Sequence, residues 1–285
     1  MNVQWFPGHM AKTRRMMSEQ LGLIDIVVEL LDARLPLSSQ NPEISNIIGD
    51  KPRLIILNKA DLADDAVNQE WVRYFKEKGI YAILLDSVHA KNLNFVADKI
   101  RLVLKDKLEK QAEKGMSGRS VKVMVAGIPN VGKSSFINKL AGRASAITGD
   151  RPGVTRGKQW IRLKNGIELL DTPGILWPKF EDEETGLRLA YVGSIKDEIM
   201  DVETLASKLL EFLNSEYKEE LCARYKLSET ENLMGYELLE MIGKKRGFVI
   251  SGGEIDLLRA ANIVLDEFRS SKIGKISLER PKVEE

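Results

Sequence analysis

The sequence predicts a doubly wound α/β sheet followed by an all-helical domain, and two patterns carry this prediction. Short apolar runs typical of buried parallel strands alternate with longer amphipathic stretches as far as about residue 177. Beyond Trp177-Pro178 the apolar spacing becomes wholly helical, most clearly over residues 205–213 and 255–268. Alternating strands and helices favour a parallel sheet covered on both faces, whereas the later stretch favours packed helices.

Each element expected in the first part of the chain follows from its local composition. The apolar runs predicted as buried strands are residues 24–31, 54–57, 82–85, 121–126 and 167–170. A shorter strand is expected at 160–163, because the Asn165-Gly166 pair after it is a strong hairpin signal. Helices are expected over 66–78 and 92–114. In such a sheet, ligands bind in the loops at the carboxyl ends of the strands.

The composition excludes several classes of protein. A chain of 285 residues is long enough for two domains, and its net charge of +1 creates no global field for a nucleic acid. The single cysteine, Cys222, excludes a disulfide framework and a cysteine-rich zinc site. We find no apolar run long enough to span a membrane and no signal-peptide pattern at the N-terminus. We therefore expect a cytoplasmic monomer with no membrane partner.

A phosphate-binding loop follows the expected strand at 121–126. Residues 127–134 fit the pattern G-x-x-x-x-G-K-S, in which backbone amides and the start of a helix surround a phosphate. Lys133 is expected to reach the β- and γ-phosphates, and Ser134 to bind Mg²⁺. The nucleotide-binding residues expected here are Asn130, Val131, Gly132, Lys133, Ser134 and Ser135. This loop alone would also suit an ATPase.

A guanine-reading motif removes that ambiguity. Asn58, Lys59, Ala60 and Asp61 follow the expected strand at 54–57. The Asp61 carboxylate can accept from the N1–H and the exocyclic amine of guanine, a pair that adenine does not present. The Lys59 stem can lie along the base, while Asn58 either ties the loop to the phosphate loop or reads the base. Alone the motif could be an ordinary helix-start loop, but beside a phosphate loop it predicts GTP.

Three further loops complete the expected site. Asp86 and Ser87 follow the strand at 82–85 and are the candidates for a backbone-donor loop at guanine O6. Asp171 opens the pattern D-x-x-G, so we expect it to hold Mg²⁺ through water and the Gly174 amide to contact the γ-phosphate. Thr155 is the candidate for the threonine that completes the Mg²⁺ shell; its alternative role is that of a simple turn residue.

The order of these motifs is unusual. In ordinary GTPases the phosphate loop comes first and the guanine motif near the end, whereas here the guanine motif comes first. We therefore predict a circularly permuted P-loop GTPase sheet with a C-terminal all-helical domain. The glycine- and serine-bearing linker at 113–120 lies where an unpermuted domain would have its termini. The expected division is a basic N-terminal segment at 1–20, the GTPase domain at 21–179 and the helical domain at 180–285.

The residues that would catalyse GTP hydrolysis do not follow from these motifs alone. Ras-type GTPases place a water-orienting glutamine directly after D-x-x-G, but Ile175 occupies that position and cannot hydrogen-bond. His9 could orient or activate water, or it could be a surface histidine on a mobile N-terminus. The Asn130 carbonyl could help bind K⁺ beside the phosphates and so stabilise the transition state, or Asn130 could simply form a turn. His9, Lys133 and Thr155 are the candidate catalytic residues.

The motif order, together with W-F-P-G-H-M at 5–10, D-A-R at 32–34 and the loop at 127–134, resembles the ribosome biogenesis GTPase A family. The resemblance runs end to end and includes residues 243–247, 252–253 and 259–261. It implies a permuted GTPase acting in late assembly of the large ribosomal subunit. It also implies a role for His9 in hydrolysis, support by K⁺, stimulation by the large subunit and contact of the helical domain with rRNA. For Asp32 and Arg34 we expect an ion pair that holds the loop.

Two functions of different classes follow. The first is an assembly GTPase that binds the pre-large subunit, hydrolyses GTP to complete maturation and then releases itself. The alternative is a nucleotide-gated RNA-binding module with incidental hydrolysis, and a weaker one is a GTPase with a tRNA-related partner. The basic residues of the helical part that would face RNA are Lys244, Lys245, Arg246, Arg259, Arg269, Lys272 and Lys275. Such a cluster can equally be a solvated face.

Overall fold

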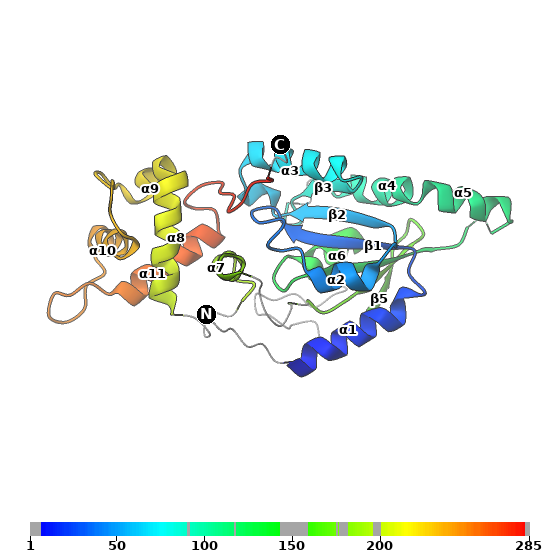
Figure 1. The fold of residues 1–285 in the computed structure, drawn as a ribbon, viewed down its shortest axis with the longest axis horizontal. Coiled ribbons are helices and arrows are strands. Elements are labelled where there is room, and N and C mark those ends of the chain that lie inside the picture. Colours follow the sequence, from blue (N-terminus) through cyan, green and yellow to red (C-terminus); the bar gives the residue numbers. More distant parts are fainter. Residues whose placement is uncertain are drawn as a thin grey trace. The chain divides into compact units, whose positions relative to one another are not determined.

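A computed structural model describes residues 7–89, 92–116, 118–142, 159–174, 176, 182–195 and 201–282, with their side chains except those of 7–13 and 159 (Figure 1). The chain forms two compact units. The first comprises residues 1–180 together with 277–285, and the second comprises residues 181–276. Among the described helices, none is long and apolar enough to cross a membrane.

The first unit is built on a six-stranded sheet with the strand order β3-β2-β1-β4-β6-β5. Its strands are β1 (Ile26–Asp32), β2 (Arg53–Asn58), β3 (Tyr81–Leu85), β4 (Val121–Gly127), β5 (Gln159–Arg162) and β6 (Ile167–Asp171). All neighbouring pairs are parallel except β5 and β6, which form the hairpin predicted from Asn165-Gly166. The central strands β1 and β4 are mostly apolar and almost entirely buried because both faces of the sheet are covered.

Helices cover the sheet in a doubly wound arrangement, as predicted. They are α1 (Pro7–Leu21), α2 (Pro42–Ile48), α3 (Asp65–Glu77), α4 (Asn94–Val103), α5 (Lys105–Glu113) and α6 (Lys133–Ala141). Val27 of β1 packs in one core cluster with α1 and α2, and Leu31 packs in another with α3, so these helices share one face. Right-handed crossovers place α4 and α6 on the other face. The winding direction reverses between β1 and β4, which is where such sheets bind ligands.

The structure differs from the expected elements in two places. The helix expected over 92–114 is two helices, α4 and α5, which meet at the buried residue Leu104. No helix was expected in the N-terminal segment at 1–20, but helix α1 occupies it from Pro7 onward. Helix α1 begins at Pro7, a residue well suited to a first helical turn, and Met17 of this helix is fully buried in the core beside Met124.

The second unit contains only helices in its described part, apart from a single bridge between Val249 and Ile255. Its helices are α7 (Glu183–Tyr191), α8 (Val202–Glu216), α9 (Lys218–Tyr225), α10 (Gly235–Arg246) and α11 (Leu257–Arg269). Helix α8 contacts each of the other four, and its buried leucines, such as Leu205, Leu209 and Leu213, form the centre of the core. The helical pattern read beyond residue 177 is therefore present.

The end of the chain departs from the division expected at residue 180. We expected residues 180–285 to form one helical part, but Ser277 and the residues after it pack with the first unit. The backbone amide of Leu278 donates to the Arg34 carbonyl oxygen (2.7 Å), and the Leu278 side chain is buried. The described end of the chain accordingly lies beside α3 (Figure 1), where Arg280 pairs with Glu70.

Candidate nucleotide-binding site

The predicted motif residues meet at one edge of the sheet. Asp32, Asn58, Gly127 and Asp171 end strands β1, β2, β4 and β6, and Asp86 follows β3. The strand pairing places Asp32 opposite Asn58 and Asn58 opposite Leu85, so the loops that follow emerge side by side. This edge includes the point between β1 and β4 where the winding reverses. The structure therefore brings the guanine motif and the phosphate motif into one site.

The phosphate loop runs from Gly127 to the start of α6. Asn130 and Gly132 both have positive φ, of 57° and 98°, and this tight path leads into the N-terminus of a helix. The Lys133 side chain folds back over the loop, and its Nζ donates to the carbonyl oxygens of Gly127 (3.0 Å) and Ile128 (2.7 Å). Burial lowers the pKa of Lys133 to about 8, and the nearby Asp171 carboxylate opposes this shift. The arrangement is suited to receiving a phosphate chain.

Asp171 lies beside this lysine at the end of β6. Burial raises the pKa of its carboxyl to about 6, while Lys133 acts in the opposite direction. Its Oδ1 atom is buried and accepts no hydrogen bond from the described residues. A buried carboxylate oxygen of this kind is a suitable ligand for a hard cation such as Mg²⁺, directly or through water. The donor set thus fits the metal that the motif predicts.

Gly174 brings the D-x-x-G loop against the phosphate loop. A Cβ atom added there would lie 2.7 Å from the Pro129 nitrogen and 2.9 Å from Lys133 Nζ. Only glycine allows this close approach. The loop is anchored by Thr172, whose hydroxyl donates to the Val125 carbonyl oxygen (2.7 Å). The backbone of Gly174 is consequently held close to Lys133 Nζ and the phosphate loop.

Asn58 joins three loops. Its Nδ2 donates to the Val131 carbonyl oxygen of the phosphate loop (2.7 Å), and its Oδ1 accepts from the Ser87 amide (3.3 Å). The contact with the phosphate loop is close, because a Cβ added at Gly132 would lie 2.4 Å from Asn58 Nδ2. Both ends of the carboxamide are therefore engaged by protein. Of the two roles considered for Asn58, this geometry favours the tie between loops.

Asp32 connects the D-A-R motif to the guanine motif. Arg34 donates to both of its carboxylate oxygens, from Nε to Oδ1 (2.9 Å) and from Nη2 to Oδ2 (2.8 Å), which is the expected ion pair. Lys59 Nζ also lies 3.0 Å from Asp32 Oδ2. Burial alone would raise the pKa of Asp32, but Arg34 and Lys59 hold it well below its usual range. The Lys59 pKa is lowered by burial and by Arg34, against the attraction of Asp32.

The contact between Asp32 and Lys59 was not predicted from the sequence. The signal was nevertheless present, because strands β1 and β2 run in parallel and Asp32 is paired with Asn58, the residue before Lys59. Lys59 itself has a left-handed backbone, with φ of 59° and ψ of 34°, which turns the chain into the short helix η1 (Ala60–Leu62). The carboxylate therefore helps to fix the position of a guanine-motif side chain.

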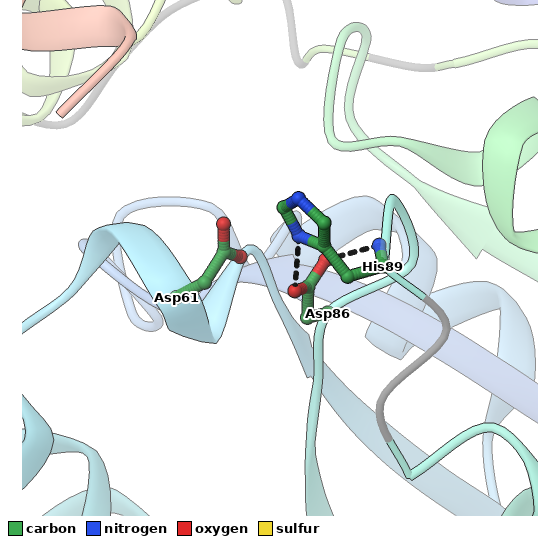
Figure 2. A group of neighbouring side chains, drawn as sticks. All are labelled: Asp61, Asp86 and His89. Atoms are coloured by element: carbon green, nitrogen blue, oxygen red, sulfur yellow. Dashed lines mark hydrogen bonds and ion pairs between the residues drawn. The ribbon is translucent and has the colours of Figure 1, made fainter.

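Asp61, Asp86 and His89 form a cluster in the loops that follow β2 and β3 (Figure 2). The Asp86 carboxylate accepts from the Val88 and His89 amides (3.0 and 2.9 Å) and pairs with His89 Nδ1 (2.6 Å). Burial acts to raise the pKa of Asp86, but these bonds outweigh it and lower the pKa. Three donors already occupy this carboxylate, so it acts as a cap of its own loop rather than as a metal ligand. His89, to which the sequence assigned no chemistry, lies beside the guanine-motif carboxylate.

Several predicted roles are not decided by these contacts. The O6-binding role of Asp86 and Ser87 stays a prediction, and the Ser87 amide donates to Asn58 instead. Thr155 and Ile175 lie outside the described residues, as does the side chain of His9, whose backbone belongs to the first turn of α1. The left-handed Asn130 backbone is compatible with both a turn and a K⁺ ligand.

The chain is similar to known GTPases over most of its length. Residues 122–229 match the family described as 50S ribosome-binding GTPase. The ribosome biogenesis GTPase A of Bacillus cereus is 50% identical over 282 residues, covering 99% of this chain and 95% of the relative. The Thermotoga maritima protein of the same name is 32% identical and covers 98% and 95%. A GDP-bound structure of TM YlqF is 28% identical with a TM-score of 0.69, covering 94% of this chain and 99% of its own.

Replacing Asp32 by Asn should lower the free energy of unfolding by about 3–5 kcal/mol at pH 7, because Arg34 and Lys59 would stay buried without their anion. A carboxyl with a depressed pKa contributes stability above its ordinary pKa of about 4 and loses it as the pH falls below that value. The difference between wild type and Asp32→Asn in urea unfolding should therefore shrink from pH 7 to pH 3. Asp50→Asn, on an exposed residue, is the control. An equal difference at both pH values would contradict this account.

Proposed function

This chain belongs to the ribosome biogenesis GTPase A family, whose members are GTPases of ribosome assembly, and on this premise we propose that it acts on the pre-large ribosomal subunit. In this proposal the protein binds the assembling subunit and its rRNA in the cytoplasm. Hydrolysis of GTP, stimulated by the subunit, completes late maturation and releases the protein.

One observation carries the proposal: the Asn58 carboxamide bonds the guanine motif to the phosphate loop in a single site. A site that contains both motifs selects GTP over ATP, because Asp61 can pair with guanine and not with adenine. The similarity to a GDP-bound structure of TM YlqF supports the same ligand class. The nucleotide would contact residues 58–61, 86–87 and 130–135 and the Gly174 amide.

The residues that would hold Mg²⁺ are Ser134 and Thr155, with Asp171 acting through water. When bound, Mg²⁺ neutralises charge that develops on the phosphates. Lys133, which already lies over the loop, binds the β- and γ-phosphates once its internal bonds exchange for phosphate oxygens. His9 orients the attacking water, since Ile175 cannot. Asn130 contributes to a K⁺ site that adds positive charge beside the phosphates.

The permutation offers a route from hydrolysis to release. The D-x-x-G loop ends at Gly174, and the helical unit begins a few residues later at 181. A change in the loop on loss of the γ-phosphate is therefore transmitted along a short covalent connection. Equal affinity of the subunit for the GDP form and for the form with a non-hydrolysable analogue would rule out this route.

The second candidate is the nucleotide-gated RNA-binding module. It is favoured by the apolar Ile175 and by the basic surface of α10 and α11. Part of that charge is already paired, since Arg246 and Arg224 both bond to Glu267 and Lys244 pairs with Glu240. Arg259, by contrast, is exposed, and its guanidinium carbon lies 4.6 Å from the centre of the Phe248 ring.

Turnover of GTP in potassium buffer should be slow for the protein alone and should rise by about tenfold or more with purified large subunits. GTPase activators reach about 10³–10⁵-fold when they complete the charge stabilisation of the transition state. Sodium buffer should lower the stimulated rate. Phosphate release under multiple-turnover conditions measures all three rates. Tight GTP binding by the wild-type protein without any stimulation would instead favour the nucleotide-gated module.

His9→Ala should lower the stimulated turnover by about 100-fold and keep GTP binding.

Replacing Asp61 by Asn should reverse the base preference. The carboxamide can no longer accept from both guanine donors, but it can donate to the 2-oxo group of xanthine. We expect GTP affinity to fall by about 100-fold or more and xanthosine triphosphate to become the better ligand. Competition against a fluorescent nucleotide gives both constants, with Asp50→Asn as the control. Guanine selectivity that survives in Asp61→Asn would refute the base-reading role.

A further inference from the structure

The end of the chain packs against the loops that support the guanine motif. We call residues 277–282 the C-terminal tail; they follow directly after the helical unit, which ends at residue 276, and belong to the first unit. The side chains of Leu278 and Glu279 are only 3% and 9% exposed. A buried carboxylate near the end of a chain requires an explanation, because its desolvation is unfavourable unless donors surround it.

Glu279 is surrounded by donors. Its carboxylate accepts from the backbone amides of Leu37 and Ser38 (3.1 Å for Ser38) and from the Ser38 hydroxyl (2.6 Å). Its carbonyl oxygen accepts from Nε1 of Trp71 (3.3 Å), a fully buried residue of α3. Bonds to a charged acceptor are among the stronger hydrogen bonds in proteins. One residue of the tail therefore fastens the loop after β1 and the helix after the guanine motif.

The neighbouring tail residues reinforce the same two elements. The Leu278 amide donates to the Arg34 carbonyl oxygen (2.7 Å), and the Ser277 hydroxyl accepts from the Asp64 amide (3.2 Å). Asp64 is the N-cap of α3 and lies three residues after Asp61. The tail is thus bonded to the chain on both sides of the guanine motif.

A continuous series of contacts leads from the tail to Lys59. Ser39, next to the residues that Glu279 holds, accepts from the Asp32 amide through its hydroxyl (3.0 Å). Arg34, whose carbonyl the tail holds, donates twice to the Asp32 carboxylate. That carboxylate in turn lies 3.0 Å from Lys59 Nζ. The loop that the tail fastens is therefore the loop that positions the Asp32 carboxylate, the ion-pair partner of Lys59.

We propose that the C-terminal tail positions the guanine-reading lysine, and that Glu279 is a positioning residue for recognition of the base. This inference rests on the proposed function, because it takes Lys59 and Asp61 as the base-reading residues. Docking of the tail and binding of a guanine nucleotide then stabilise each other, since linkage between two equilibria is reciprocal. The tail continues the helical unit, so a partner that binds this unit and draws the tail away lowers the affinity for the nucleotide.

The test compares a ligand that has a base with one that has none. Glu279→Ala should raise the Kd for GDP by about tenfold, within the 5–150-fold range of typical coupling, and leave the Kd for inorganic triphosphate unchanged. Both constants come from competition against a fluorescent guanine nucleotide in Mg²⁺. Arg280→Ala is the matched control, because Arg280 belongs to the same tail but forms an exposed pair with Glu70. Its two constants should equal those of the wild type.

The outcomes separate positioning from general stability. If Glu279→Ala binds GDP as tightly as the wild type, or weakens both ligands equally, the inference is overturned. If this variant does not fold, Glu279→Gln and Ser38→Ala decide, since each keeps part of the bonding and should give a smaller, base-dependent loss. Failure of the proposed function would appear earlier, as equal affinity of the wild-type protein for GDP and ADP, and would overturn both.

Discussion

The nucleotide site depends on one buried carboxamide. Parallel strands end in separate loops, and nothing in the sheet itself fixes these loops relative to one another. Asn58 does so, because its two polar atoms bond to Val131 and to Ser87 at full burial. Leaving either atom without its partner would cost about 1–3 kcal/mol, so these bonds couple the guanine motif energetically to the phosphate loop and to the 86–89 loop. The buried Asp86 and the exposed His89 pair within this 86–89 loop (Figure 2).

Charge around this carboxamide is arranged to favour an anionic ligand. Asp32 is the single carboxylate between two cations, Arg34 and Lys59, and Lys133 lies over the phosphate loop. Arg34 and Lys59 are held by Asp32, whereas Lys133 is bonded to the carbonyl oxygens of Gly127 and Ile128, which a phosphate would have to replace. The lowered pKa values of Lys59 and Lys133 show that burial already disfavours their charge. An anion beside Lys133 would offset this cost of burial.

The sequence was sufficient for the sheet and the motifs but not for the tail. Apolar runs such as 121–126 indicate strands because burial on both faces leaves few polar positions, and each motif follows such a strand. The break at Leu104 was missed, since both flanking segments have helical periodicity. Glu279 gives no sequence signal at all. A charged residue near a chain end is ordinarily expected to be exposed, and the burial of Glu279 depends on hydrogen-bond donors more than 200 residues away in the sequence.

The tail also gives the permutation a consequence beyond a change of motif order. Joining the termini of an ordinary GTPase domain at the linker 113–120 and opening the chain elsewhere leaves the sheet order intact but moves the chain ends. The helical unit is therefore connected to the GTPase unit twice, after Gly174 on the phosphate side and through Ser277 on the guanine side. A unit held at one point can move without affecting the site. The helical unit is instead joined to the first unit by two stretches of chain, one following the D-x-x-G loop and one bonded to the start of α3.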